Sequence, residues 1–252
     1  MIGSAIMLAI IGGSGLSTLP EVSFTRKQII RTPYGLPSAP LYFGRMGAQE
    51  MVFLSRHGAH YALAPHEINY RANLWALREA GAEGIISVTA VASLCAHIAP
   101  GSLVIPHDLI DYTYGRHHTF FEGQNQEVVH TDFACPYSED LRHSIRSLAA
   151  ATHTQLTQQA VYACIQGPRL PTCAEARRYA QDGAEVLGMT GMPEAILARE
   201  LGLPYAPVCG VIGQAANLSC TDTTPDFRRQ HSHAAMAHIR HLLTGLADNE
   251  TA

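Results

Sequence analysis

Short, almost entirely apolar runs recur along the chain, and each is followed by glycine or polar residues. The first covers residues 5–11 and runs into Gly12 and Gly13. Apolar runs of this length, without polar alternation, are typical of strands buried on both faces of a sheet. The same pattern predicts further strands at 51–55, 84–92, 103–105, 161–165, 186–189 and 205–212.

Between these runs, apolar residues recur at helical spacing. In 69–80 they are Tyr70, Leu74, Leu77 and Ala80, and Gly81 follows as a helix stop. Similar patterns predict helices at 141–152, 173–182 and 194–201, with Pro193 opening the last of these, and a final helix that begins at Thr224-Pro225. The alternation predicts one α/β domain over 1–252, with a central mixed, mostly parallel sheet and helices on both faces.

Charge and length exclude several classes of partner. The 252 residues include 17 Lys+Arg and 21 Asp+Glu, a formal net charge of −4 with no block of either sign. This balance argues against nucleic acid or an acidic membrane as a partner. The longest apolar run is too short for a bilayer span and lacks the features of a signal peptide, so we expect a cytoplasmic protein.

Cysteine and histidine spacing gives no sign of a metal site. The six cysteines form no C-x-x-C pair, so we expect reduced and mostly buried thiols. Residues 66–69 begin like the zinc motif H-E-x-x-H, but Asn69 stands in place of the second histidine. The last helix carries four histidines, which we interpret as part of its polar face: His231, His233, His238 and His241.

Candidate chemistry follows the first three predicted strands. Ser14 lies in the loop GGSGL after the first strand, Arg56-His57 follow the second, and Thr89 lies within the third. In a parallel sheet these side chains would meet at one edge and form an oxyanion or phosphate site. Two alternatives remain open. The loop with Ser14 could be an ordinary glycine turn, and the Thr89 hydroxyl could be hydrogen-bonded to backbone. No protein nucleophile is evident, and none is needed if phosphate itself attacks.

Longer motifs extend this picture. IGGSGL, SRHGAHYALAPHEINYRAN, QGPRLPTCAEA and GMTGMPEAILARELGLPYA occur in this order between residues 5 and 246. They resemble the 5′-methylthioadenosine phosphorylase branch of the trimeric purine nucleoside phosphorylase family, which includes methylthioinosine-specific bacterial members. The resemblance implies phosphorolysis, a reaction in which inorganic phosphate is a co-substrate and no cofactor takes part. It also implies that the enzyme is a homotrimer.

The resemblance also assigns roles to individual residues. Met189 would pack under the ribose, and His130 of a neighbouring subunit would close the 5′ side. The phosphate would be held by five residues: Ser14, Arg56, His57, Thr89 and Thr190.

The segment expected to contact the base departs from the family pattern. Relatives place Asp or Asn where ungapped counting gives Gly213 and Ala215. The nearest amides, Gln214 and Asn217, are therefore our candidates for the catalytic contact to the purine. Because no acid is at hand to protonate N7 of adenine, the pattern favours hypoxanthine as the leaving base. Both amides could instead be loop residues bonded to their own backbone.

Two further segments could set specificity. Leu170 and Pro171 replace an aromatic residue and a serine of adenosine-type relatives, and the adjacent Thr172 could supply the lost hydroxyl. Phe227, with Met236 and Ile239, could line an apolar pocket for the 5′-methylthio group, although the same spacing describes the buried stripe of a helix.

The function predicted from the sequence is cleavage of S-methyl-5′-thioinosine by phosphate, giving hypoxanthine and 5-methylthioribose 1-phosphate. Two alternatives are a 5′-methylthioadenosine phosphorylase that releases adenine and a non-catalytic nucleoside binder with the same fold. A nucleoside hydrolase is disfavoured, because water as the nucleophile needs no Arg56 anion clamp.

Overall fold

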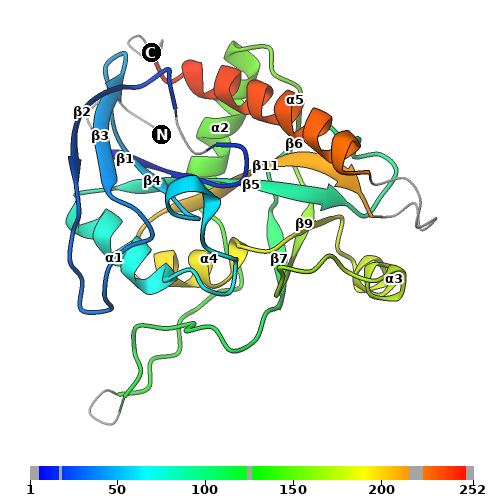
Figure 1. The fold of residues 1–252 in the computed structure, drawn as a ribbon, viewed down its shortest axis with the longest axis horizontal. Helices are drawn as coiled ribbons and strands as arrows, with labels where there is room; N and C mark the ends of the chain where they lie inside the picture. Colours follow the sequence, from blue (N-terminus) through cyan, green and yellow to red (C-terminus); the bar gives the residue numbers. More distant parts are fainter. Residues whose placement is uncertain (1–5, 17–18, 124–126, 216–223, 248–252) are drawn as a thin grey trace.

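A computed structural model describes residues 6–16, 19–123, 127–215 and 224–247 (Figure 1). The strands are β1 (Leu8–Gly12), β2 (Ser23–Gln28), β3 (Leu41–Met46), β4 (Gln49–Ser55), β5 (Gly84–Ser93), β6 (Leu103–Val104), β7 (Asp108–Tyr112), β8 (Leu156–Thr157), β9 (Val161–Ile165), β10 (Val186–Gly188) and β11 (Tyr205–Gln214). The helices are α1 (Tyr70–Glu79), α2 (Glu139–Ala151), α3 (Cys173–Gln181), α4 (Gly191–Glu200) and α5 (Pro225–Thr244), with a short 3-10 turn, η1, at Ala59–Tyr61.

The strands form one mixed sheet, as predicted. Its main path runs β2-β3-β4-β1-β5-β10-β9-β7, and β11, β6 and β8 branch from β5. The pairs of β1 with β4 and β5, of β5 with β11, and of β9 with β7 and β10 are parallel. Antiparallel pairs join β2, β3 and β4 at one end and link β5 to β10.

Helices cover both faces of the sheet (Figure 1). Leu74 and Leu77 of α1 pack with Leu197 of α4 in the core on one face. Ile145 of α2 and Ile239 of α5 belong to the core on the other. The α/β architecture with helices on both faces is therefore confirmed.

Local capping chemistry sets the helix ends. The side chains of Asn69, Ser138, Thr172 and Thr224 each accept a hydrogen bond from the first turn of the following helix. In α4, Met192 has non-helical backbone angles (φ −118°, ψ 138°), so the regular helix begins after it at Pro193, as the sequence predicts.

Strands β4, β5 and β11 are longer than predicted, and four other strands were not predicted. β11 continues two residues past 212, and its pairing with β5 shifts register between Val211 and Gly213. The strand predicted to end at 212 therefore includes Gly213 and Gln214, both of which pair with β5. Strands β2, β3, β7 and β8 were missed; all six residues of β2 are exposed and β8 has only two, so neither produces a long apolar run.

One edge of β5 carries a gap that positions the site. β1 pairs with this strand as far as Ser87, and β10 pairs with it only from Ala92 onward. The intervening residues 88–91 bond to β11 on the other edge. At these residues β5 is unpaired on the edge between its parallel neighbour β1 and its antiparallel neighbour β10, so a crevice can form beside β5.

The expectation that most cysteines are buried is wrong. Of the five described cysteines, all free, Cys164 and Cys209 are buried, Cys135 is exposed, and Cys95 and Cys173 are partly exposed. Cys220 lies outside the described residues.

One face of the last helix, α5, is buried, as the apolar spacing predicts. Met236, Ile239, Leu242 and Leu243 are buried. Among the described segments, every helix is too short or too polar to cross a bilayer.

Candidate active site

A pocket of about 450 Å³ opens at the gap in β5, beside the carboxyl ends of β1 and β4. This volume suits a small organic ligand. The pocket gathers most of the residues that the sequence singled out: Ser14, Arg56, His57, Thr89, Leu170, Pro171, Met189, Thr190, Gly213, Gln214 and Ala215.

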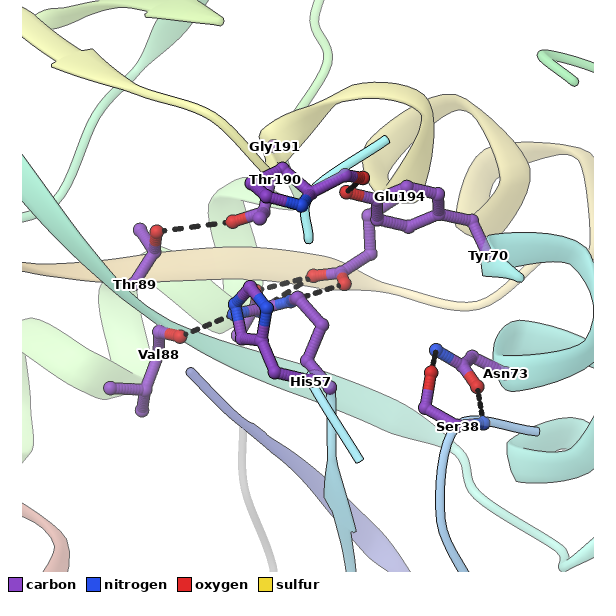
Figure 2. A network of polar contacts seen from close by, with 12 residues as sticks. Ser38, His57, Tyr70, Asn73, Val88, Thr89, Thr190, Gly191 and Glu194 are labelled. Atoms are coloured by element: carbon purple, nitrogen blue, oxygen red, sulfur yellow. Dashed lines mark hydrogen bonds and ion pairs between the residues drawn. The ribbon is translucent and has the colours of Figure 1, made fainter. Parts of the chain in front are cut away.

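Arg56 is the buried cation of this pocket, with 1% of its surface exposed. Its Nε and Nη2 donate to the two carboxylate oxygens of Glu194 at 2.8 and 3.0 Å (Figure 2). Nη2 also donates to Ser87 Oγ at 2.6 Å, and Nη1 donates to the Val88 carbonyl at 2.9 Å. A Cβ on Gly13 would lie 2.6 Å from Nη1, so glycine allows the first loop to pass directly over the guanidinium.

Glu194 is a site residue that the sequence analysis missed. It is fully buried, and besides Arg56 it accepts hydrogen bonds from Ser87 Oγ at 2.5 Å and Tyr205 Oη at 2.9 Å. Burial by itself would lower the pKa of Arg56, but the charge and hydrogen bonds of Glu194 outweigh it and raise that pKa above its usual range. The guanidinium is therefore permanently charged and fixed in direction. A glutamate within the apolar segment GMPEAILA was the available signal.

His57 is neutral at physiological pH. Burial and the adjacent Arg56 charge lower its pKa from 6.5 to about 4. Its Nδ1 lies 2.8 Å from the Leu63 carbonyl, which can only accept, so Nδ1 carries the proton. Nε2 is left as a hydrogen-bond acceptor. The ring lies against Tyr61, with 4.2 Å between the centroids.

Hydroxyl groups supply the other polar atoms at this end. Thr89 Oγ1 and Thr190 Oγ1 lie 3.2 Å apart (Figure 2), and Ser14 Oγ lies 2.6 Å from Tyr61 Oη. Thr89 lies within β5, as predicted, and it lines the pocket because the gap in pairing includes it. Tyr61, also missed, has a positive φ of 59° in the turn after Arg56.

The middle of the pocket is shaped around Met189. Gly167, with φ +60°, leaves room for it, since a Cβ there would lie 2.6 Å from Met189 Sδ. Arg116 donates to the carbonyls of Met189 (3.0 Å) and Gln166 (2.7 Å), and also to that of Met192. Arg116, which the sequence did not single out, thus joins the segment before α4 and the segment after β9 by hydrogen bonds.

The far end of the pocket contains the predicted base-contacting segment. Gly213, Gln214 and Ala215 line it, and Asn217 lies outside the described residues. The Gln214 amide Nε2 lies 3.4 Å from the Cys95 carbonyl, and Ala215 N donates to the Ser93 carbonyl at 2.7 Å. No Asp or Glu occurs in the part of the pocket lining that the structure describes.

Several other predicted residues lie elsewhere. Phe227 is not part of the described lining and packs against His231 at 4.0 Å, while the neighbouring Arg228 does line the pocket. Met236 and Ile239 belong to the core, so the helix-stripe alternative holds for them. Thr172 lines the pocket, but its hydroxyl accepts from Glu175 N as the cap of α3.

His130, expected to act from a neighbouring subunit, is exposed and outside this chain's described pocket lining.

The fold and this pocket agree with the sequence comparisons. The family model described as "Phosphorylase superfamily" matches residues 7–247, and the chain belongs to this superfamily.

Among its relatives, the chain is 48% identical over 211 residues to a probable S-methyl-5′-thioinosine phosphorylase of Pseudomonas syringae pv. tomato, covering 84% of this chain and 86% of that protein. It is 41% identical over 217 residues to a 6-oxopurine nucleoside phosphorylase of Pyrococcus furiosus, covering 84% and 81%. A methylthioadenosine phosphorylase structure from Schistosoma mansoni in complex with adenine superimposes with a TM-score of 0.89 at 28% identity, covering 96% and 91%.

Proposed function

We propose that this phosphorylase cleaves S-methyl-5′-thioinosine with inorganic phosphate to hypoxanthine and 5-methylthioribose 1-phosphate. The observation that carries the proposal is the polarity of the pocket. Hydroxyls, His57 and Arg56 gather at one end, and the described lining at the other end offers the Gln214 amide and no carboxylate. The names of the relatives from Pseudomonas syringae and Pyrococcus furiosus support a 6-oxopurine.

Phosphate binds at the polar end in this proposal. Arg56 and the hydroxyls of Ser14, Thr89 and Thr190 donate to its oxygens, and Nε2 of neutral His57 accepts a hydrogen bond from its O–H group. The bound anion then lies beside C1′ of the sugar. Holding the two reactants in this orientation supplies a large part of the rate gain.

The leaving base departs at the amide end. Positive charge develops on the sugar ring and negative charge on the purine as the glycosidic bond breaks. Phosphate stabilises the positive charge on the sugar. The amides of Gln214 and Asn217 donate hydrogen bonds to O6 and N7 of the purine, where the negative charge develops. Hypoxanthine accepts at both atoms, whereas the 6-amino group of adenine needs an acceptor.

A trimer completes the site in this proposal. His130 of a neighbouring subunit closes the 5′ side, where Leu170 and Pro171 of this chain bring apolar surface suited to a methylthio group. No cofactor is assigned a step, because phosphate is the attacking group.

The test measures free base after incubation of the protein with methylthioinosine, methylthioadenosine or inosine, each with and without phosphate. We expect phosphate-dependent hypoxanthine release from methylthioinosine and little adenine release. Gln214→Leu lowers kcat for methylthioinosine at least tenfold. Asp222→Asn, which changes the first acidic residue after Gln214 in the sequence, leaves it unchanged. Adenine release that is lost in Asp222→Asn would instead show an acid-assisted methylthioadenosine phosphorylase. Absence of turnover with all three substrates would indicate a nucleoside binder.

A further inference from the structure

Three side chains of metal-ligating type meet behind the amide end of the pocket. Cys95 and His97 lie in the turn after β5, and Glu185 directly precedes β10. Cys95 Sγ is 3.7 Å from His97 Nε2, and Nε2 is 3.3 Å from Glu185 Oε1. All three candidate donor atoms lie within 4.8 Å of one another, and no other such group of three occurs among the described residues.

Two of the three separations match the edges of a zinc tetrahedron, and the third, from Cys95 Sγ to the Glu185 carboxylate, is within 4.8 Å. With Zn–S of about 2.3 Å and Zn–N and Zn–O of about 2.0–2.1 Å, tetrahedral angles place S and N about 3.6 Å apart and N and O about 3.3–3.4 Å apart. The observed 3.7 and 3.3 Å therefore need little adjustment to bind an ion. Thiolate, imidazole and carboxylate are also the donor types that zinc takes in proteins.

The surrounding backbone already orients two of these ligands. Glu185 Oε2 accepts from Val161 N at 3.2 Å, which turns Oε1 toward His97. Ser93 Oγ accepts from Cys95 N at 3.2 Å and donates to the Cys95 carbonyl at 2.6 Å, which fixes the turn that carries the thiol. Such secondary contacts strengthen protein metal sites.

The cluster is also open to solution. The His97 side chain is 65% exposed and that of Glu185 is 32% exposed. An ion can therefore reach the three donors without disturbing the core, as a functional metal site requires.

We propose that Cys95, His97 and Glu185 form a binding site for a zinc-class divalent cation, with water as the fourth ligand. On binding, the Cys95 thiol loses its proton to solvent and its thiolate coordinates the metal. Spacing in the sequence gave no hint of this, because Cys95 and Glu185 are 90 positions apart and the cluster contains no C-x-x-C pair.

The site adjoins the end of the pocket assigned to the base. The Ser93 carbonyl accepts from Ala215 N, and the Cys95 carbonyl lies 3.4 Å from the Gln214 amide. A bound ion thus fixes the turn against which the end of β11 rests.

The test is a titration of the full-length, reduced protein with Co²⁺, followed by displacement with Zn²⁺, in the absence of nucleoside and phosphate. We expect one Co²⁺ per chain, with a thiolate-to-cobalt absorption band and the visible bands of tetrahedral cobalt. Cys95→Ser removes the thiolate band, and His97→Ala weakens binding at least tenfold. Since His97 is largely exposed, its variant leaves the fold intact.

Two control variants distinguish metal binding at this cluster from binding by other cysteine and histidine side chains. Cys135→Ser changes an exposed cysteine outside the cluster, and His238→Ala changes a histidine of α5; neither should alter the band. The absence of a thiolate band in the wild-type protein, or a band that persists in Cys95→Ser, would overturn the proposal. Neither result depends on turnover, so the metal site and the proposed reaction are tested separately.

Discussion

The Arg56 guanidinium and the Glu194 carboxylate form a buried two-point ion pair between residues 138 positions apart in the sequence. With the bonds to Ser87 and Val88, this arrangement engages four of the five N–H groups of Arg56. Among its described contacts, the second N–H of Nη1 remains for a ligand oxygen. In the proposed function, Arg56 therefore binds phosphate from a direction that Glu194 determines.

Glu194→Gln tests this positioning. The substitution leaves Arg56 charged and buried without its counter-ion, which costs about 3–5 kcal/mol of the free energy of unfolding. We also expect a higher KM for phosphate, because the guanidinium loses its fixed direction. Urea denaturation and steady-state kinetics measure the two effects. A variant as stable as the wild-type protein would contradict the ion-pair interpretation.

The hydroxyls of Thr89 and Thr190 can each be removed with little change in the shape of the side chain. Thr89→Val and Thr190→Val each delete a donor worth about 1–1.5 kcal/mol. Each should raise the KM for phosphate about tenfold, since 1.4 kcal/mol corresponds to a factor of ten, and leave the KM for nucleoside nearly unchanged. Thr25→Val, in the exposed strand β2, is the matched control. A raised KM for nucleoside with an unchanged KM for phosphate would place these hydroxyls against the nucleoside instead.

His57 should make the fold sensitive to acid. Its pKa is about 4 in the folded protein and 6.5 in its ordinary state, so between these pH values the unfolded chain binds more protons at this position. The free energy of unfolding therefore falls as the pH is lowered through this window. His57→Gln should lose less stability between pH 7 and pH 5 than the wild-type protein. The exposed His143, replaced by Gln, should not reproduce this change.

Arg116→Met tests the link between the segments around Met189. Loss of a charged donor to backbone carbonyls costs about 1.5–3 kcal/mol. We expect a lower Tm and a higher KM for nucleoside, with a smaller effect on the KM for phosphate. Arg177→Met, at an exposed position of α3, should change neither. Unchanged nucleoside binding in Arg116→Met would show that Met189 keeps its place without the arginine.

The sequence predicts the buried strands and the polar end of the pocket for the same reason. Apolar runs mark strands that are covered on both faces, and Ser14, Arg56 and His57 follow such runs directly. The polar strand β2 leaves no such signal because all of its residues are exposed.

Residues that act through distant partners were not predictable from local patterns. Glu194 and Arg116 have roles set by contacts across 138 and 73 positions, and no local pattern encodes those contacts. At the amide end, the predicted residues Gly213, Gln214 and Ala215 line the pocket, and Asn217 lies outside the described residues.

The gap in β5 joins groups from the two halves of the chain. Ser14, Arg56 and Thr89 come from the first 93 residues, whereas Met189 and Thr190 follow β10. An anion held in the gap would therefore contact both halves of the chain, and a chain that ends before β10 would lack Met189 and Thr190. In the proposed function, phosphate at 100 times its Kd adds about 2.7 kcal/mol to the folded state. In this proposal the co-substrate therefore also stabilises the association of the two halves of the folded chain.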